Sequence, residues 1–209
     1  MNLRTLTMLA LFVPILSGCI GAAAVGVGAG ALIFADRRPT ETVLTDEGIE
    51  IRAGNRIREK FGDRVHVNVT SYNRTVLLTG EVPDAAAREE IEKLVSGVNN
   101  VKAISNELAV GAISTLSNRS NDVYITSKVK ARFIDAATVS PVHVKVITEA
   151  GIVYLMGQVT TRESNAAVEV ARTTAGVQKV VRVFEIISDA EARRLDPPKP
   201  APQSNPTTP

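Results

Sequence analysis

Few residues in this chain could take part in covalent or acid–base chemistry. Its 209 residues include two histidines, His66 and His143, one cysteine, Cys19, and no tryptophan. This supply excludes a zinc ribbon, an iron–sulfur cluster and a disulfide framework within one chain. No glycine-rich phosphate loop, serine nucleophile motif or metal-ligand spacing occurs, and each histidine lies alone near the first strand of its repeat. The sequence therefore predicts a binding protein that is not an enzyme and carries no metal or other cofactor.

The charge balance excludes a second class of protein. The chain has 24 lysines and arginines against 22 acidic residues, which gives a formal net charge of +2. A balance this close to zero argues against a protein that coats nucleic acid. The length has room for one or two small domains.

Cys19 lies at the end of an N-terminal targeting sequence. Arg4 precedes a short apolar core, residues 9–15, which is too short to span a bilayer and has the layout of a secretory signal peptide. The motif Leu16-Ser17-Gly18-Cys19 resembles the bacterial lipobox. That resemblance implies removal of residues 1–18 as a signal peptide, a diacylglyceryl group on the Cys19 thiol, and a further acyl chain such as palmitate on its amino group. Ile20, where an Asp would retain the protein in the inner membrane, implies export to the outer membrane.

Residues 19–44 are predicted to form an acylated tether. One acyl chain gives marginal membrane affinity, whereas the two or three chains of a lipoprotein cysteine anchor it stably. The run 20–35 is apolar and rich in glycine, but it is slightly shorter than the roughly 20 residues of a membrane span. Its small residues could pack helices together within lipid. We favour the simpler interpretation of a flexible tether that lies along the membrane.

The rest of the chain contains an internal repeat with a period of about 77 residues. Val67–Val82 aligns with Val144–Val159, and each segment is followed by an Ala-rich charged stretch, a Gly-Val pair and an apolar strand-like run. A period this long indicates two copies of one domain. We predict these domains at residues 45–111 and 121–188. A polar linker is expected at 112–120, and a disordered Pro-rich tail at 189–209.

Each copy has the pattern helix, strand, strand, helix, strand. In the first copy, Asp46 is expected to cap a helix whose buried side is spaced at four residues, and Asp84 is expected to cap the second helix. In the second copy, Asn121 or Asp122 is expected to cap a helix that ends at Ile134. Thr160 with Glu163 matches a capping box.

The order of these elements predicts the fold. A tight turn requires an antiparallel strand pair, and a helical crossover favours a parallel pair. We therefore predict an α+β fold in which each copy is a mixed three-stranded sheet with two helices on one face. Gly80 and Gly157 recur near the end of the second strand, and a glycine there indicates either a β-bulge or a close approach of the backbone.

The two copies differ in charge. Residues 46–110 contain nine basic and eleven acidic residues, whereas residues 122–187 contain eight basic and six acidic ones. The basic excess is concentrated in the opening helix of the second copy, where aromatic and aliphatic residues alternate with it. This composition is typical of a helix that binds a membrane surface. The same apolar residues, spaced at four, would also serve as a core stripe. The residues concerned are Tyr124, Ile125, Lys128, Val129, Lys130, Arg132, Phe133 and Ile134.

The pattern Val-x-Leu-x-Gly-x-Val, followed by a helix, a Gly-Val pair and a last strand, resembles the BON domain. Two such copies behind a lipobox resemble the two-domain BON lipoproteins of the Gram-negative outer membrane. The resemblance covers about residues 19–187. Its most similar stretches are Asn68-Val69-Thr70, Val76-Leu77-Leu78-Thr79-Gly80, Ser120–Val129 and Leu155–Glu163.

The resemblance implies a function for the second copy. Its opening helix is expected to bind anionic phospholipid, either phosphatidylglycerol or cardiolipin. Carried over by position, the lipid-binding residues are Tyr124, Lys128, Phe133 and Ile134, with Lys130 and Arg132 as charged neighbours. The expected protein faces the periplasm, maintains envelope integrity and acts at division sites. The alternative is a periplasmic interaction module that docks outer-membrane assembly machinery or regulators of cell-wall amidases.

Overall fold

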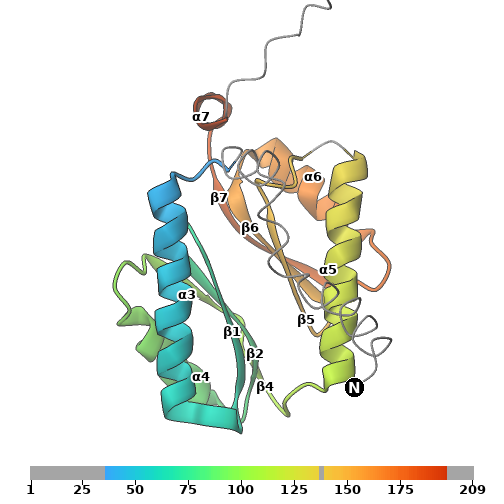
Figure 1. Cartoon of the computed structure of the whole chain (residues 1–209). Coiled ribbons are helices and arrows are strands. Elements are labelled where there is room, and N and C mark those ends of the chain that lie inside the picture. The colour runs from blue at the N-terminus through green and yellow to red at the C-terminus, as the bar shows by residue number, and fades with distance from the viewer. Residues whose placement is uncertain (1–35, 137–138, 197–209) are drawn as a thin grey trace, which may run out of the picture. The chain divides into compact units, whose positions relative to one another are not determined.

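The computed structural model describes residues 36–136 and 139–196. The signal peptide predicted at 1–18, the acylated Cys19, most of the tether at 19–44 and residues 197–209 of the predicted tail lie outside the described residues. Within the described part, the chain forms two consecutive αββαβ domains, and a short helix follows them (Figure 1).

The first domain pairs a long helix and a short helix with one sheet. Strand β1 is antiparallel to β2, and β2 is parallel to both β3 and β4. Two short strands, β3 and β4, therefore share the place of the predicted third strand. The elements are α3 (Thr40–Phe61), the 3-10 turn η3 (Gly62–Arg64), β1 (His66–Tyr72), β2 (Thr75–Val82), α4 (Ala85–Ser96), β3 (Ala103–Asn106) and β4 (Ala109–Val110).

The second domain repeats this topology with three strands. Strand β5 is antiparallel to β6, and β6 is parallel to β7. The predicted α+β fold with mixed sheets is confirmed. The elements are α5 (Leu116–Ala136), β5 (Lys145–Glu149), β6 (Ile152–Val159), α6 (Thr161–Arg172) and β7 (Lys179–Ile186).

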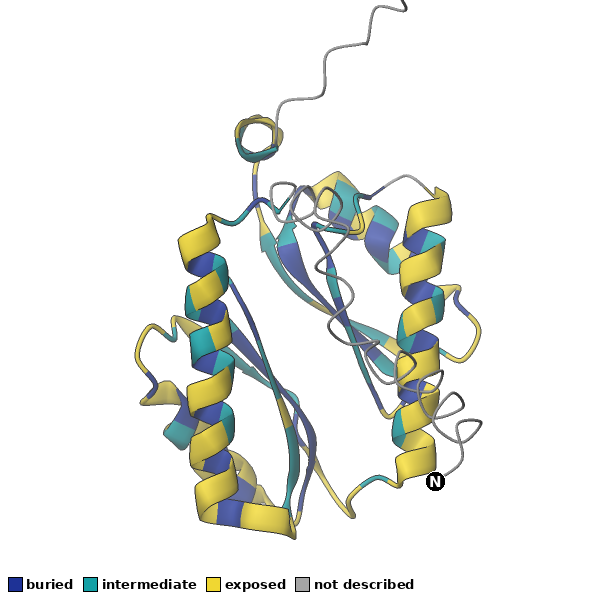
Figure 2. Ribbon diagram, in the orientation of Figure 1, coloured by how far each residue is buried: buried dark blue, intermediate teal, exposed yellow. Residues whose placement is uncertain are grey.

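Each domain has its own hydrophobic core between its helices and its sheet, visible as the buried stripes on the helices in Figure 2. In the first domain, the predicted stripe at spacing four on α3 is buried. In the second domain, α5 and α6 bury the equivalent stripes. The α3 residues are Ile49, Ala53, Ile57 and Phe61, and those of α5 and α6 are Ile125, Val129, Phe133, Ala167, Val170 and Ala171.

Both opening helices begin earlier than predicted. Helix α3 begins at Thr40 and α5 at Leu116, so the caps predicted at Asp46 and at Asn121 or Asp122 are wrong. The two aspartates are instead buried within their helices and accept hydrogen bonds from the hairpin turn of their own domain. Asp46 accepts from the N–H groups of Asn73 and Arg74, each at 2.8 Å. Asp122 accepts from the turn amides of residues 150 and 151, at 2.9 and 2.8 Å.

The caps predicted for the second helix of each domain are confirmed, whereas α5 runs to Ala136, two residues past its predicted end at Ile134. The Asp84 side chain accepts from the Ala87 amide at the start of α4, and Thr160 with Glu163 forms the complete capping box of α6. The predicted disordered tail, however, is wrong at its start. Helix α7 (Asp189–Leu195) begins there, because the Ser188 side chain caps it and Ala192 is buried.

The two domains contact each other through the sheet faces that their helices leave uncovered. A third apolar cluster consists of Tyr72 and Leu77 from the first sheet and Tyr154 and Met156 from the second. Polar contacts lie around it: the Asn73 amide donates to Glu185 at 2.6 Å, and the Lys145 ammonium donates to Glu50 at 2.9 Å. The central strands β2 and β6 are thus buried on both faces.

Arg37, which precedes α3 in the chain, is bound into the second domain. Its side chain is only 1% exposed, and all five of its N–H donors are used. It forms a forked pair with Glu163, a second pair with Asp196 and a bond to the carbonyl of Gln158, at 2.7–3.3 Å. Burial alone would raise the pKa of Glu163, but the hydrogen bonds and charge of Arg37 lower it to about 2. This pair is therefore ionised throughout the neutral range.

Gly80 and Gly157 have the close backbone approach predicted from the sequence. Gly80 has φ +115°, and a Cβ on it would lie 2.0 Å from the carbonyl oxygen of His66 on the paired strand. A Cβ on Gly157 would lie 2.2 Å from the equivalent oxygen of His143.

We expect Gly80→Ala to lower the free energy of unfolding by about 3 kcal/mol, measured by urea denaturation, because the backbone must move to admit the methyl group.

Gly54→Ala is the matched control for that change. Gly54 lies inside α3 with nothing within 4 Å of its added Cβ, so the alanine should stabilise the protein by about 0.5–1 kcal/mol. Equal effects of the two substitutions would contradict the close approach in the sheet.

Replacing Arg37 by Ala should lower the free energy of unfolding by about 3 kcal/mol, because it leaves the partly buried carboxylate of Glu163 without a cation. Because the pKa of Glu163 is lowered in the folded state, its contribution is present above about pH 4.5 and is lost as the pH falls toward 2. Urea denaturation at several pH values should show that the free energy of unfolding falls at acid pH in the natural chain and falls less in the variant.

Arg172→Ala, which removes an exposed pair with Glu169, should change the free energy of unfolding by less than about 0.5 kcal/mol.

Candidate membrane-binding face of helix α5

Helix α5 has one face inside the second domain and one face in solvent. Ile125, Val129 and Phe133 lie at steps of four and are at most 1% exposed, packed against the sheet. Phe133 was expected from the sequence to enter lipid, and this expectation does not agree with its place in the core. At 1% exposure its ring has no surface to offer a membrane, because Phe133 continues the core stripe of Ile125 and Val129 at steps of four.

The outward face of α5 carries large apolar side chains. Tyr124 is 62% exposed and Ile134 is 66% exposed, as a membrane contact requires. Val123, at 67%, was not predicted from the sequence and lies on the same side as Ile134, eleven residues or about three turns away. The sequence did contain a signal for Val123. It lies seven residues before Lys130 and eleven before Ile134, and these spacings place all three residues on one stripe of the helix.

The three basic residues of α5 have different surroundings. Lys130 is exposed. The ammonium of Lys128 donates to the carbonyl of Ala175 and lies 4.5 Å from the centre of the exposed Tyr124 ring. Arg132 is half-buried and turned toward the end of α6, so its charge holds the two helices together rather than facing solvent.

Nη1 of Arg132 lies within hydrogen-bond distance of three acceptors, which share its two N–H groups. It lies 2.9 Å from the Val170 carbonyl and 3.0 and 2.9 Å from the hydroxyls of Thr173 and Thr174. These partners are one carbonyl in the last turn of α6 and two hydroxyls directly after it, where a cation is favoured by the helix dipole. The sequence predicted Arg132 as a charged neighbour of the lipid-binding residues. The composition of α5 does not reveal that its guanidinium contacts the end of α6.

A cavity of about 410 Å³ adjoins the exposed face. It lies between α5 and strands β1 and β5, so both domains contribute to its wall. Val123 and Lys130 line it from α5, Asn68 from β1 and Glu149 from β5. Among the described helices, none is long and apolar enough to cross a bilayer.

Comparison with known proteins assigns the class. The BON domain family model matches residues 52–112 and 121–188. The chain is 34% identical over 174 residues to the outer membrane lipoprotein DolP of Haemophilus influenzae, covering 82% of this chain and 90% of that one. It is 34% identical over 154 residues to a 21 kDa hemolysin of Actinobacillus pleuropneumoniae, covering 73% and 79%. It is 32% identical over 117 residues to osmotically-inducible protein Y of Escherichia coli, covering 54% and 58%.

This chain belongs to the BON domain family. Its two matched domains and its similarity to DolP over most of both chains place it with the two-domain outer-membrane lipoproteins of that family.

Arg132 and Lys130 should respond differently to loss of charge. Arg132→Gln should lower the free energy of unfolding by about 1–3 kcal/mol, because it removes charge-assisted hydrogen bonds that join α5 to α6. Lys130→Gln should change it by less than about 0.5 kcal/mol, because that side chain is exposed. Thermal or urea unfolding of both variants measures the difference, and a similar loss in both would refute the structural role given to Arg132.

Proposed function

We propose that this outer-membrane lipoprotein faces the periplasm and binds anionic phospholipid through the exposed face of α5. Val123, Tyr124 and Ile134 enter the boundary between headgroups and acyl chains, while Lys128 and Lys130 contact the phosphates. The observation that carries the proposal is that these apolar side chains are about two-thirds exposed beside two lysines. The lipids we expect are phosphatidylglycerol and cardiolipin.

The energetics favour weak binding by the folded part. A lysine near an anionic surface contributes about 1 kcal/mol, so the two lysines contribute about 2 kcal/mol. A millimolar dissociation constant corresponds to about 4 kcal/mol, so charge alone is insufficient. Burial of the exposed parts of Val123, Tyr124 and Ile134 adds on the order of 1 kcal/mol each. Charge and apolar contact are therefore both needed.

The acyl anchor makes such weak binding effective. The 17 residues from position 19 to position 35 reach at most about 60 Å when extended, and Arg37 joins the following residues to the second domain. The domain that carries α5 is thereby held within reach of the bilayer at a high local concentration. Weak tethered binding of this kind suits a protein that responds to lipid composition. By its family resemblance, the protein would support envelope integrity and concentrate at division sites.

Liposome flotation tests the lipid proposal. A chain that begins at Asp36 lacks the acyl anchor but contains all three hydrophobic clusters, so its binding reports the folded part alone. It should float with vesicles that contain phosphatidylglycerol or cardiolipin and not with neutral vesicles. Replacing Val123, Tyr124 and Ile134 together by Ser should weaken binding at least tenfold. Replacing Lys128 and Lys130 by Gln should remove the preference for anionic lipid.

The first domain offers a matched control. Leu44 and Ile51 on α3 are 63% and 64% exposed, close to the values on α5. Replacing both by Ser should leave flotation unchanged. Equal recovery of the natural sequence on neutral and anionic vesicles would overturn the proposal, as would an equal loss in the α3 and α5 variants.

The same α3 residues favour a second candidate function. Their exposure on the more acidic domain fits a surface that docks an envelope protein, such as outer-membrane assembly machinery or a regulator of cell-wall amidases. Crosslinking from α3 in intact cells would capture a stoichiometric partner if this function holds. The absence of any lipid preference in flotation would then favour it over the first.

A further inference from the structure

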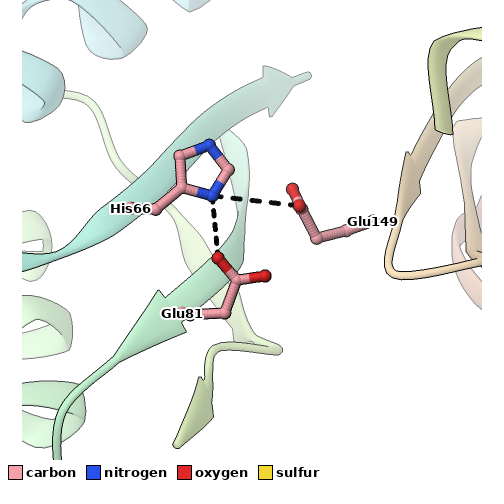
Figure 3. Close-up of side chains that lie close together, drawn as sticks. All are labelled: His66, Glu81 and Glu149. Atoms are coloured by element: carbon pink, nitrogen blue, oxygen red, sulfur yellow. Dashed lines mark hydrogen bonds and ion pairs between the residues drawn. The ribbon is translucent and has the colours of Figure 1, made fainter. Parts of the chain in front are cut away.

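Three ionisable side chains meet where the two domains join. Nδ1 of His66 on β1 lies 2.9 Å from Oε2 of Glu81 on β2 and 3.9 Å from Oε1 of Glu149 on β5 (Figure 3). His66 and Glu81 are opposite each other in the β1–β2 ladder, so both point to the face that meets the second domain. Glu149 is the last residue of β5, directly before its hairpin turn. One potential ligand atom from each residue lies within 4.8 Å of the others.

The negative charge of this cluster exceeds its positive charge. Glu81 and Glu149 are each 7% exposed, and among the described residues neither forms an ion pair with a lysine or an arginine. His66 is their shared cationic partner only when it is protonated. Two buried carboxylates at one histidine are unfavourable unless a further cation or proton balances them.

The kinds of ligand atom identify a suitable cation. One imidazole nitrogen with two carboxylate oxygens is a ligand set for Zn²⁺, whereas Ca²⁺ and Mg²⁺ prefer oxygen alone. Tetrahedral Zn²⁺ with bonds of about 2.1 Å separates its ligand atoms by about 3.4 Å. The separations from Nδ1 of His66, 2.9 and 3.9 Å, lie on either side of that value, and each differs from it by roughly half an ångström.

We propose that His66, Glu81 and Glu149 form a Zn²⁺ site that joins the first BON domain to the second. His66 and Glu81 supply two ligands from one domain, Glu149 supplies the third from the other, and water completes the coordination. The ion balances the excess negative charge in the joint and stabilises the contact between the two sheets.

Neighbouring groups support the proposed ligands. The amide of Asn68 donates to the second oxygen of Glu149 at 2.8 Å, which orients its first oxygen toward His66. The backbone N–H of Ser114 donates to Oε2 of Glu81 at 3.1 Å. His66 and Glu149 also line the 410 Å³ cavity beside α5, which gives an ion and its water ligands a route from solvent.

Titration of the full chain in nonionic detergent tests this site. After treatment with a chelator and dialysis, isothermal titration with ZnCl₂ should show one Zn²⁺ per chain, with a dissociation constant of roughly micromolar or below. His66→Gln and Glu149→Gln should each weaken binding at least tenfold. The second variant retains an amide oxygen that can accept the Asn68 bond, so it remains informative even if His66→Gln reduces stability. MgCl₂ should give no saturable binding at the same concentrations.

Glu185→Gln is the matched control. Glu185 also joins the two domains, through Asn73, but lies outside the cluster, so its neutralisation should leave Zn²⁺ affinity unchanged. NMR of the two histidines gives a second measurement: Zn²⁺ should shift the ring signals of His66 and leave those of His143 in place. The proposal is overturned if the natural chain shows no 1:1 binding, if His66→Gln binds equally well, or if the His143 signals are the ones that move.

Discussion

Burial of the two central strands on both faces is the constraint on which the rest of the molecule depends. A BON sheet covered by helices on one side still has a second side, and β6 presents Tyr154 and Met156 there. These side chains are removed from water by Tyr72 and Leu77 of the first domain. Because the sheets meet through these faces, the helices of both domains are turned outward. The same contact brings Glu149 to His66 and leaves one side of α5 in solvent.

Local rules predicted most of the fold, and contacts between distant segments account for most of the errors. Caps such as Asp84 and Thr160 act within one turn of helix, so the sequence shows both partners together. Asp46 and Asp122 look like caps by the same rule, but their partners are turn amides more than 25 residues away. The contact between domains did have a signal. The apolar run 152–156 does not alternate, which is typical of a strand buried on both faces.

The basic residues of α5 have the same charge but different contacts. Lys130 and Arg132 are two residues apart on one helix and carry the same charge, yet one is exposed and the other binds the end of α6. Arginine presents several donors in a fixed plane and suits such a contact, as the five bonds of Arg37 also show. Lysine retains a flexible, well-hydrated charge that suits a lipid phosphate. Arg37 and Arg132 therefore hold the fold together, whereas Lys130 keeps an exposed charge of the kind suited to a membrane.

The joint between the domains and the exposed face of α5 are electrostatically linked, because they share one cavity. Glu149 and Lys130 both line it, and charges within about 10 Å of each other interact appreciably even at physiological salt. The two carboxylates of the cluster lie beside Lys130, the lysine proposed to contact lipid phosphates. A divalent cation at His66, Glu81 and Glu149 would cancel the negative charge of these carboxylates and leave the potential near Lys130 more positive. Metal occupancy at the joint would then raise the attraction of α5 for an anionic bilayer without any movement of the helix.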